Sequence, residues 1–530
     1  MDPPADLVAQ LAQYKQSHLL AHFKTLSAAQ KSQLLSDLAA LDLALVAAAY
    51  EKTKQATSSQ QDVITACALV GKAEIDTDGW TWKRRAHRCV SEGRLAAVCL
   101  AGGQGTRLGF DGPKGAYDAG FPSGKSLFQL HAERIRRLQV LAGGGVVPWY
   151  VMTSPLNDAE TKAHFEERAY FGLDPAHVVF FSQGTLPCLH EDGKIMLENE
   201  HHVAAAPDGN GGVFAALAKS GALDDMAHRG VLYVHMYAVD NPLASPGDAL
   251  FVGCCVAKGV QTGNMCVPKS TWKERVGVAA MRNGAFHVVE YSEITEELAQ
   301  RTNDDGSLAF GSANICSHFF TVAFIRDVVV PGMKLLHHVA RKAIPCVGDP
   351  APTRPNGIKL ELFVFDAMPL ASSFVALQVA REGVFSPIKN ATGDDSPASA
   401  RTDVTRTHAA WALKAGAALD GQGNFEISPL LSLEGEGLEF LAGKTLHLPC
   451  ALSTSDCVPQ PALGKDHRRL VLSIAQTRQG VRVYNVLAGA SDDDANAASI
   501  KERLRAVDIA RTTPAQALFL LHELVELAKI

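Results

Sequence analysis

LAAVCLAGGQGTRLGFDGPK, residues 95–114, is the stretch that decides the fold. Its apolar first part, residues 95–100, predicts a buried strand, and four glycines in the next nine residues predict a loop directly after it. Glycine lets a ligand approach the backbone N–H groups without meeting a Cβ, and Arg107 and Lys114 add positive charge to the loop. We therefore predict a nucleotide-phosphate site at the carboxyl end of a central strand.

Neither of two well-known phosphate loops fits this stretch. A Walker A loop has four residues before its Gly-Lys-Ser, whereas only three separate Gly120 from Gly124. A dinucleotide fingerprint has two residues in its second gap, whereas Gly105 and Gly109 are separated by three. What remains is L-A-G-G-x-G-T-R-L followed by P-K, for which the alternative is a glycine-rich turn without function.

Composition limits the class of protein. A chain of 530 residues exceeds the size of one hydrophobic core, so two or three domains are expected. The formal net charge of −6 argues against nucleic acid as a partner, because there is no basic surplus to neutralise a phosphate backbone. Eleven scattered cysteines without a C-x-x-C pair, no apolar run of membrane-spanning length and no secretory signal predict a reduced, cytoplasmic protein without a membrane partner.

The pattern along the chain predicts three parts. Residues 1–90 are expected to be a helical segment, in which Ser27 and Gln30 form a capping box. Residues 91–395 alternate helical stretches with strand-like runs, among them VVPWYVMTS, HVVFFSQ, GVLYVHMYAVDN and ALFVGCCVAKG, and Asn283-Gly284 is expected to turn a hairpin. This alternation predicts an α/β fold with a Rossmann-like central domain and a mixed, mainly parallel sheet.

Residues 396–530 are expected to form a smaller α+β domain. It contains a predicted hairpin, RLVLSIAQTRQGVRVYNVL, and a final helix from Pro514 that Thr513 and Gln516 would cap. The last three residues, Ala528-Lys529-Ile530, are similar to a Ser-Lys-Leu peroxisomal address, which makes a peroxisome-like organelle the alternative location.

Residues from about 10 to 445 resemble eukaryotic-type UDP-N-acetylglucosamine pyrophosphorylases, members of the UDP-sugar pyrophosphorylase superfamily. The shared motifs are LAGGQGTRLGF, PKG, FFSQGTLPC, APDGNGG, YAVDN, VVEYSE, NGIKLELFVFD and FSPIKN. The chain beyond about residue 450 does not match the family pattern. The resemblance implies a nucleotidyltransferase fold, Mg²⁺ as cofactor, and UTP, N-acetylglucosamine 1-phosphate, UDP-N-acetylglucosamine and pyrophosphate as small-molecule partners.

Several motifs also carry chemistry of their own. Asp240 ends a strand and could hold a magnesium ion that shares its ligands with a triphosphate, although Asp-Asn also opens simple turns. Glu290 could accept hydrogen bonds from two sugar hydroxyls. The glycine-rich turn at 207–212 could expose an amide to a base and a sugar, or could be a plain turn before a helix.

The resemblance assigns the remaining roles. For UTP it implies Leu100, Ala101, Gly102, Gly103, Lys114, Gln183, Gly209, Asp240 and Lys359. For the sugar phosphate it implies Asn210, Gly277, Glu290, Tyr291, Asn314 and Lys389. Arg107, Lys114 and Lys389 would be catalytic, the first two holding pyrophosphate and Lys389 stabilising the α-phosphate transition state. The adjacent histidine pairs at 201–202 and 337–338 do not share a helix face, so zinc is not expected.

The predicted reaction is uridylyl transfer from UTP to N-acetylglucosamine 1-phosphate. UDP-glucose and broad-specificity UDP-sugar pyrophosphorylases are the alternative enzymes, and they carry histidine where Asn210 stands. An inactive relative that serves as a scaffold is the non-enzyme alternative, against which the retained Arg107, Lys114, Asp240, Glu290 and Lys389 argue. The oligomeric state stays open.

Overall fold

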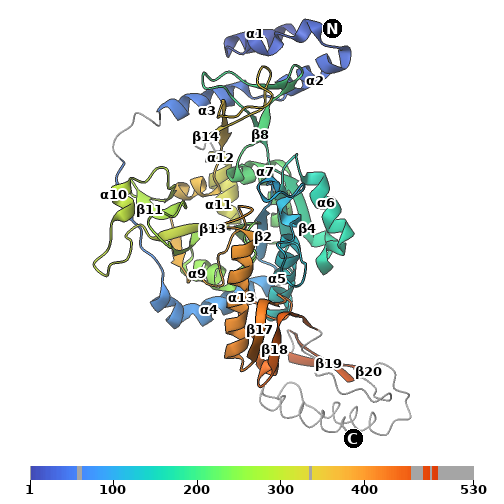
Figure 1. The fold of residues 1–530 in the computed structure, drawn as a ribbon, viewed down its shortest axis with the longest axis vertical. Helices are drawn as coiled ribbons and strands as arrows, with labels where there is room; N and C mark the ends of the chain where they lie inside the picture. The colour runs from blue at the N-terminus through green and yellow to red at the C-terminus, as the bar shows by residue number, and fades with distance from the viewer. Residues whose placement is uncertain (1, 56–61, 333–336, 455–469, 478–479, 488–530) are drawn as a thin grey trace.

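The computed structural model describes residues 2–530 except 56–61, 333–336, 455–469, 478–479 and 488–530. Figure 1 shows an elongated molecule in which helices α1 (Ala5–Gln13) and α2 (Ala28–Ala39) lie at one end of the long axis. The central sheet lies in the middle, and strands β17 (Ala418–Ile427) and β18 (Thr445–Leu452) lie toward the other end.

Ten strands of the described chain form the central sheet, and the predicted strand β2 (Leu95–Leu100) lies inside it. It pairs in parallel with β9 (Tyr233–Ala238) on one side and β3 (Trp149–Thr153) on the other, and β3 pairs in parallel with β4 (Val178–Ser182). Beyond β9 the sheet becomes antiparallel through β13 (Ser312–Thr321). The expected mixed α/β sheet is therefore confirmed, with its parallel block around β2.

The remaining strands of this sheet lie beyond β13. They are β10 (Thr262–Pro268), β16 (Phe374–Gln378), β11 (Val278–Arg282), β12 (Ala285–Val289) and the short edge strand β1 (Ile64–Ala66). The hairpin turn predicted at Asn283-Gly284 joins β11 to β12, and both residues have positive φ, as a two-residue hairpin loop requires.

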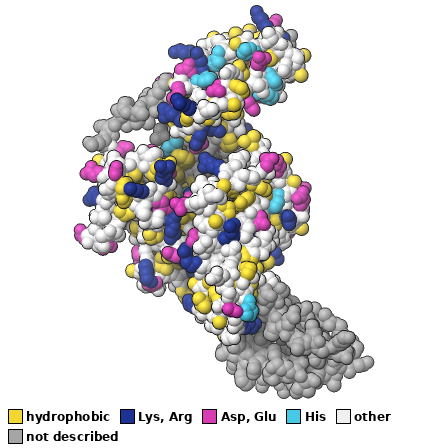
Figure 2. All heavy atoms as spheres, in the orientation of Figure 1, with side chains coloured by type: hydrophobic (Ala, Val, Ile, Leu, Met, Phe, Trp, Pro, Cys, Tyr) yellow, Lys and Arg dark blue, Asp and Glu magenta, His cyan; other side chains and the backbone are white. Residues whose placement is uncertain are grey.

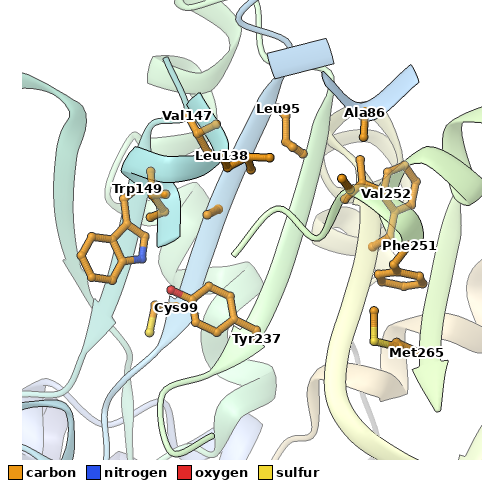
Figure 3. Packing of buried hydrophobic residues seen from close by; sticks show 14 of the residues in the cluster. Ala86, Leu95, Cys99, Leu138, Val147, Trp149, Tyr237, Phe251, Val252 and Met265 are labelled. Atoms are coloured by element: carbon orange, nitrogen blue, oxygen red, sulfur yellow. The ribbon is translucent and has the colours of Figure 1, made fainter. Parts of the chain in front are cut away.

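The two faces of β2 enter two different cores. Leu95, Ala97 and Cys99 pack on one side with helices α4 (Lys72–Ser91) and α5 (Leu127–Leu141), and Figure 3 shows Cys99 beside Trp149 and Tyr237 on that side. The alternate residues of β2 pack on the other side with α7 (Val213–Lys219) and α8 (Ala222–His228). Because both faces are covered, the strand is an unbroken apolar run, as parallel sheets require.

One predicted strand is wrong. The run ALFVGCCVAKG forms helix α9 (Ala249–Lys258), which packs against α4 in the core. Asp248 caps its start by accepting a hydrogen bond from the Phe251 N–H, and Gly259 ends it in the left-handed conformation. An apolar run of this length cannot be assigned by periodicity alone, and the two caps are the signal that the prediction missed.

The N-terminal helices pack away from the central sheet. Leucines of α1 and α2, together with residues of α3 (Leu43–Gln55), share a core with β6 (Leu197–Asn199), β7 (His202–Val203) and β15 (Gly357–Glu361). The predicted capping box of α2 is confirmed, because Ser27 and Gln30 each bond to the other's backbone N–H. In contrast, β1 is a strand of the central sheet, and α4 packs on one face of that sheet.

The C-terminal part begins with helix α13 (Pro397–Lys414), which packs on the parallel pair β17 and β18. The predicted late hairpin is confirmed as β19 (Leu470–Thr477) and β20 (Gly480–Leu487). The predicted final helix at Thr513, Pro514 and Gln516 and the tripeptide Ala528-Lys529-Ile530 lie outside the described residues. The predicted domain limits at 90 and 395 and the family limit near 450 stay predictions.

The smaller elements connect these parts. They are α6 (Asp158–Glu167), α10 (Glu296–Gln300), α11 (Val322–Phe324), α12 (Val330–Gly332), β5 (Thr185–Pro187), β8 (Ala205–Pro207) and β14 (His338–Lys342). Where the structure describes the chain, its ten cysteines are all free thiols, as predicted for these residues. No single helix in the same part is long and apolar enough to cross a membrane, and one bent pair, Ala28–Ala39 with Leu43–Lys52, meets that test by length and composition.

Candidate nucleotide-sugar site

The carboxyl ends of the parallel strands meet at one edge of the sheet, and the predicted site residues follow them. The glycine loop follows β2, Gln183 follows β4, and Asp240 lies two residues beyond the end of β9. Ligands of open α/β sheets bind beyond the carboxyl ends of the strands, so the fold itself selects this edge.

The glycine loop is held in shape by its own backbone and by one buried side chain. The Lys114 N–H donates to the Gly103 carbonyl over 3.1 Å. The Asn157 amide, almost completely buried, donates to the carbonyls of Ala101 (3.0 Å) and Gly103 (3.2 Å). Asn157 was not among the predicted residues. Its place after β3, at the same edge of the sheet, was the available signal.

A cavity of about 360 Å³ opens beside this loop. Seven residues predicted to bind UTP or the sugar line it, namely Leu100, Gly102, Gly103, Gln183, Gly209, Asn210 and Lys359. Its other walls, which were not among the predicted site residues, are Met152, Ala206, Pro207, Glu361 and Phe363. Of the predicted UTP residues, Lys114 and Asp240 do not line this cavity, and neither does Ala101. Ala101 is fully buried, and its N–H and carbonyl are hydrogen-bonded to Met152 and Asn157.

Two glycines are required by the close packing around this cavity. A Cβ on Gly102 would lie 2.6 Å from Oε1 of Gln183, so the loop and the predicted base-reading amide are in contact. Gly209 has a φ of +86°, and a Cβ there would lie 2.3 Å from the Leu362 carbonyl oxygen. The turn at 207–212 is therefore fitted against the chain that leaves β15, and Asn210 Oδ1 accepts from the Val364 N–H at 2.9 Å.

Asp208 in the same turn is an unusual carboxyl group. Its Oδ1 is buried and has no hydrogen-bond partner within the described chain, and burial raises the pKa of Asp208 to about 7. Its backbone joins both neighbouring segments, since its N–H donates to the Gly184 carbonyl and its carbonyl accepts from the Leu362 N–H. The site therefore contains a carboxyl group that is partly protonated near neutral pH.

The charged part of the site lies at the end of β9. Lys114 Nζ lies 3.0 Å from Asp240 Oδ2, and both side chains are half-buried. The Ile388 N–H donates to the Asp240 carbonyl at 2.8 Å. The predicted Lys389 follows Ile388 in the sequence, so this bond brings its backbone close to Asp240. The Lys389 ammonium forms an ion pair with Asp395 over 3.2 Å. The structure thus brings together three of the predicted phosphate and metal residues.

A third group gathers the predicted sugar residues. The Asn314 N–H donates to the Gly277 carbonyl at 2.8 Å, and a Cβ on Gly277 would lie 2.8 Å from Glu290 Oε1. Burial, together with the nearby Glu293 carboxylate, raises the pKa of Glu290. This group therefore presents the Asn314 amide and the Glu290 carboxylate close together, with the Gly277 backbone packed between them and no side chain on it.

The Cys316 thiol on β13 lies within electrostatic range of residues of both the sugar group and the charged group. Burial raises its pKa to about 12, and the charges of Asp240, Lys389 and Glu290 all act on it. These three side chains, which come from distant parts of the sequence, therefore all lie within electrostatic range of one residue of β13. The thiol itself is protonated at neutral pH and is not a nucleophile.

Two predicted residues are not brought into these groups. Arg107 is exposed, and it makes no hydrogen bond or ion pair with any described residue. The Tyr291 side chain is 48% exposed. Both lie on loops near the site, and their predicted roles stay predictions.

The described residues hold no group of three or more histidine, cysteine or acidic side chains that could bind a metal. Asp240 is a single carboxylate beside phosphate-binding candidates, which suits Mg²⁺, an ion that takes one or two protein oxygens and completes its shell with phosphates and water. Of the histidine pairs, His338 has its Nε2 at 3.1 Å from the Asp366 carboxylate. Burial lowers the pKa of His338, but the bond to Asp366 together with the negative charges of Asp366, Glu293 and Glu290 outweighs burial, so the pKa is raised overall.

Residues 46–437 match the family model described as UTP--glucose-1-phosphate uridylyltransferase. The chain is 41% identical to human UDP-N-acetylhexosamine pyrophosphorylase-like protein 1, covering 86% of this chain and 98% of that one. It is 40% identical to UDP-N-acetylglucosamine diphosphorylase 1 of Arabidopsis thaliana, covering 85% and 94%.

A solved structure has the same fold. The uridine diphosphate N-acetylglucosamine pyrophosphorylase from Trypanosoma brucei superposes with a TM-score of 0.74 at 29% identity, covering 86% of this chain and all of that one. The resemblance predicted from the motifs is confirmed. The chain belongs to the UTP--glucose-1-phosphate uridylyltransferase family, and its relatives there include proteins named UDP-N-acetylhexosamine pyrophosphorylase-like protein 1 and UDP-N-acetylglucosamine diphosphorylase 1.

Proposed function

We propose that the protein transfers the uridylyl group of UTP to N-acetylglucosamine 1-phosphate, forming UDP-N-acetylglucosamine and pyrophosphate. One observation carries the proposal. A cavity lined by Gln183 and Gly209 adjoins the glycine loop, and the same loop ends in Lys114, which contacts Asp240. A nucleoside could occupy the cavity while its phosphates extend along the loop toward the charged group.

The cavity walls favour a uracil base. Gln183 presents an amide, which can donate to a uracil carbonyl and accept from the N3–H of the base. Gly209 has no Cβ, so a base can approach the backbone of this turn closely. Leu100 and Met152 offer apolar surface to the ring. Lys359 adds a positive charge at the same cavity and would meet the phosphates.

The reaction needs no protein base. A non-bridging oxygen of the sugar phosphate, already an anion, forms a bond to the α-phosphorus while the bond from that phosphorus to the bridging oxygen of pyrophosphate breaks. The barrier is the repulsion between the two anions and the charge that builds on the α-phosphate, so positioning and positive charge provide the catalysis. Lys114 and Lys389 would supply that charge near Asp240, and the exposed Arg107 would reach the leaving pyrophosphate.

Magnesium is part of the proposal. Asp240 would hold the ion, and the bound ion would neutralise phosphate charge. The Lys114–Asp240 contact places a cation on the carboxylate that the ion would share, so the lysine would turn to the phosphates when substrate binds.

The sugar is proposed to be N-acetylated. Glu290 can accept hydrogen bonds from sugar hydroxyls, and Gly277 packs closely beside it, because a Cβ there would lie 2.8 Å from Glu290 Oε1. Asn210 replaces the histidine of UDP-glucose enzymes, and its Oδ1 already accepts from Val364, so its amide N–H groups are left to donate toward the sugar.

Turnover with a panel of sugar phosphates tests this function. We expect N-acetylglucosamine 1-phosphate to give the highest kcat/KM with UTP, above N-acetylgalactosamine 1-phosphate and well above glucose 1-phosphate. A preference for glucose 1-phosphate would favour the UDP-glucose alternative, and no turnover of any of the three by folded protein would favour a scaffold. Replacing both Arg107 and Lys114 by alanine should abolish turnover while the protein stays folded.

A further inference from the structure

A second, larger cavity lies on the other side of the charged group. It encloses about 630 Å³ between the central domain and the C-terminal part, with walls from α4, β9, β13 and α13. This is within the range of small-molecule sites. It shares no lining residue with the cavity beside the glycine loop, so it is a separate space.

Of the four cationic side chains that line this cavity, three form ion pairs with acidic side chains. Lys83 forms an ion pair with Glu434, Lys72 with Asp76 at 2.8 Å, and Arg406 with Asp403. The fourth cation, Arg134 of α5, forms no hydrogen bond or ion pair with any residue that the structure describes.

Arg134 is also deeply buried, with only 9% of its surface exposed. Burial lowers its pKa to about 10, which leaves the guanidinium charged at neutral pH. The two acids that act on it are bound elsewhere, since Glu133 accepts from Lys125 at 2.7 Å and Glu426 accepts from Ser123 at 2.9 Å. A buried charge without a partner is costly, so an anion that reached this guanidinium would gain a strong, charge-assisted contact.

The other walls determine the kind of anion. Ile75, Leu250, Ile315, Val384 and Trp411 present apolar surface to the cavity. A ligand that fits must therefore have an apolar body, and a single charge matches the one uncompensated cation better than a phosphate dianion does. Carboxylate also matches the planar fork of a guanidinium.

We propose that this cavity binds a small monocarboxylate with an apolar or aromatic body, its carboxylate on Arg134 and its body against the α4 and α13 walls. The cavity lies directly behind the charged group. Ala238 and Asn241, which line it, flank Asp240 along the chain, and the Asn241 amide donates to the carbonyl of Val384, another lining residue, at 2.7 Å. This inference does not depend on the proposed reaction.

Isothermal titration calorimetry with 4-phenylbutyrate tests the proposal. The full chain is titrated in the presence of saturating UTP, so that the cations beside the glycine loop are occupied. We expect one binding site, with 4-phenylbutanamide, the neutral analogue, binding about tenfold more weakly or worse because it lacks the charge-assisted contact. Inorganic phosphate is expected to bind this site more weakly than the carboxylate.

Two variants locate the site. Arg134→Met should weaken 4-phenylbutyrate about tenfold or more. Ala410→Phe, at an exposed position of α13 that lines the cavity, should weaken it by filling the space while leaving Arg134 in place. If Arg134→Met does not fold, the affinity of Ala410→Phe for 4-phenylbutyrate and the affinity of the wild type for 4-phenylbutanamide test the proposal instead. No binding of 4-phenylbutyrate, equal binding of the amide, displacement by UTP, or unchanged affinity in a folded variant would each overturn the proposal.

Discussion

Asn157 is the residue whose removal should show how much the shape of the glycine loop contributes. Its amide donates to Ala101 and Gly103, and its Oδ1 accepts from the Ser154 N–H at 2.8 Å. Asn157→Ala leaves these buried groups unpaired, so we expect a loss of about 1–3 kcal/mol in the free energy of unfolding. The loop would also be displaced, and kcat/KM for UTP should fall by about 100-fold.

The matched control is Gln104→Ala in the same loop. Within the described chain the Gln104 side chain makes one hydrogen bond, which its amide donates to the Leu156 carbonyl at 3.1 Å in a partly exposed position. Steady-state kinetics and urea denaturation of the two variants separate a general effect of truncation from a specific one. Equal losses in both would contradict the role given to Asn157.

Asp208 should make stability depend on pH. Burial raises its pKa to about 7 in the folded protein, from an ordinary value of 3.8. Between these values the native state binds more protons than the unfolded state, so stability falls as pH rises through this window. Asp208→Asn removes this titration. The free energy of unfolding of the variant should therefore rise relative to that of the wild type from pH 4 to pH 7, on the order of a few kcal/mol at most.

Thermal unfolding of wild type and Asp208→Asn at half-unit pH steps measures this difference. All other titrating groups are common to the two proteins, so they cancel in the comparison. If the two Tm curves run parallel through the whole window, the carboxyl group titrates normally and the prediction is wrong.

Asp240 should set the magnesium requirement. If its carboxylate holds the ion, Asp240→Asn should raise the Mg²⁺ concentration for half-maximal activity by about tenfold or more, and chelation with EDTA should abolish turnover in the wild type. Asp111→Asn is the control, since Asp111 is an exposed acid of the glycine loop that is not predicted to hold the ion. Titration of activity with Mg²⁺ checks both, and identical curves for the two variants would exclude Asp240 as the ligand.

At the scale of elements, strand β15 couples the N-terminal helices to the nucleotide cavity. Leu360 is buried in the core shared with α1 and α2, while its neighbours Lys359 and Glu361 line the cavity. Leu360→Ala should cost about 2–5 kcal/mol in stability and also raise KM for UTP several-fold, because the strand that carries Lys359 loses its packing.

Leu34→Ala in α2 is the comparison. Leu34 is completely buried in the same core but lies on a helix that does not line the cavity. We expect a similar loss of stability with little change in KM, as measured by urea denaturation and UTP saturation kinetics. An equal rise in KM for both would mean that general loosening of this core, and not the position of β15, determines UTP binding.

The same elements show what a sequence can predict. The β2 strand, its loop and the Asn283-Gly284 turn were predicted because their signals are local, and Gly209 and Asn210 line the cavity as the motifs implied. Helix α9 was mistaken for a strand because its length and burial fit both elements. Asn157 and Asp208 were missed because their roles come from chain segments far away in sequence, such as the one at Leu362.

At the scale of the whole molecule, buried polar contacts join the central domain to the C-terminal part, which extends from it toward the lower end of the surface in Figure 2. Lys125 Nζ contacts Glu133 at 2.7 Å and the Ser428 hydroxyl at 3.2 Å. Ser123 donates to Glu426 from both its N–H and its hydroxyl, and burial raises the pKa of Glu426. Since Lys389 and its partner Asp395 lie just before α13, this junction also positions the segment that carries Lys389.

Burial decides which ion pairs of this junction matter. The Lys125 and Glu133 side chains, which both belong to the central domain, are 16% and 5% exposed, whereas those of Lys83 and Glu434, which join the two parts, are 35% and 52% exposed. Lys125→Met leaves the Glu133 carboxylate buried without its cation, so we expect a loss of about 3–5 kcal/mol. Lys83→Met leaves Glu434 in water, and its effect should stay within about 1 kcal/mol.

Urea denaturation measures both variants. Lys125→Met combined with Glu133→Gln should recover most of the loss, because the penalty comes from the unpaired charge and not from the missing lysine. Equal losses in the two single variants, or no recovery in the double variant, would mean that apolar packing alone holds the two parts together.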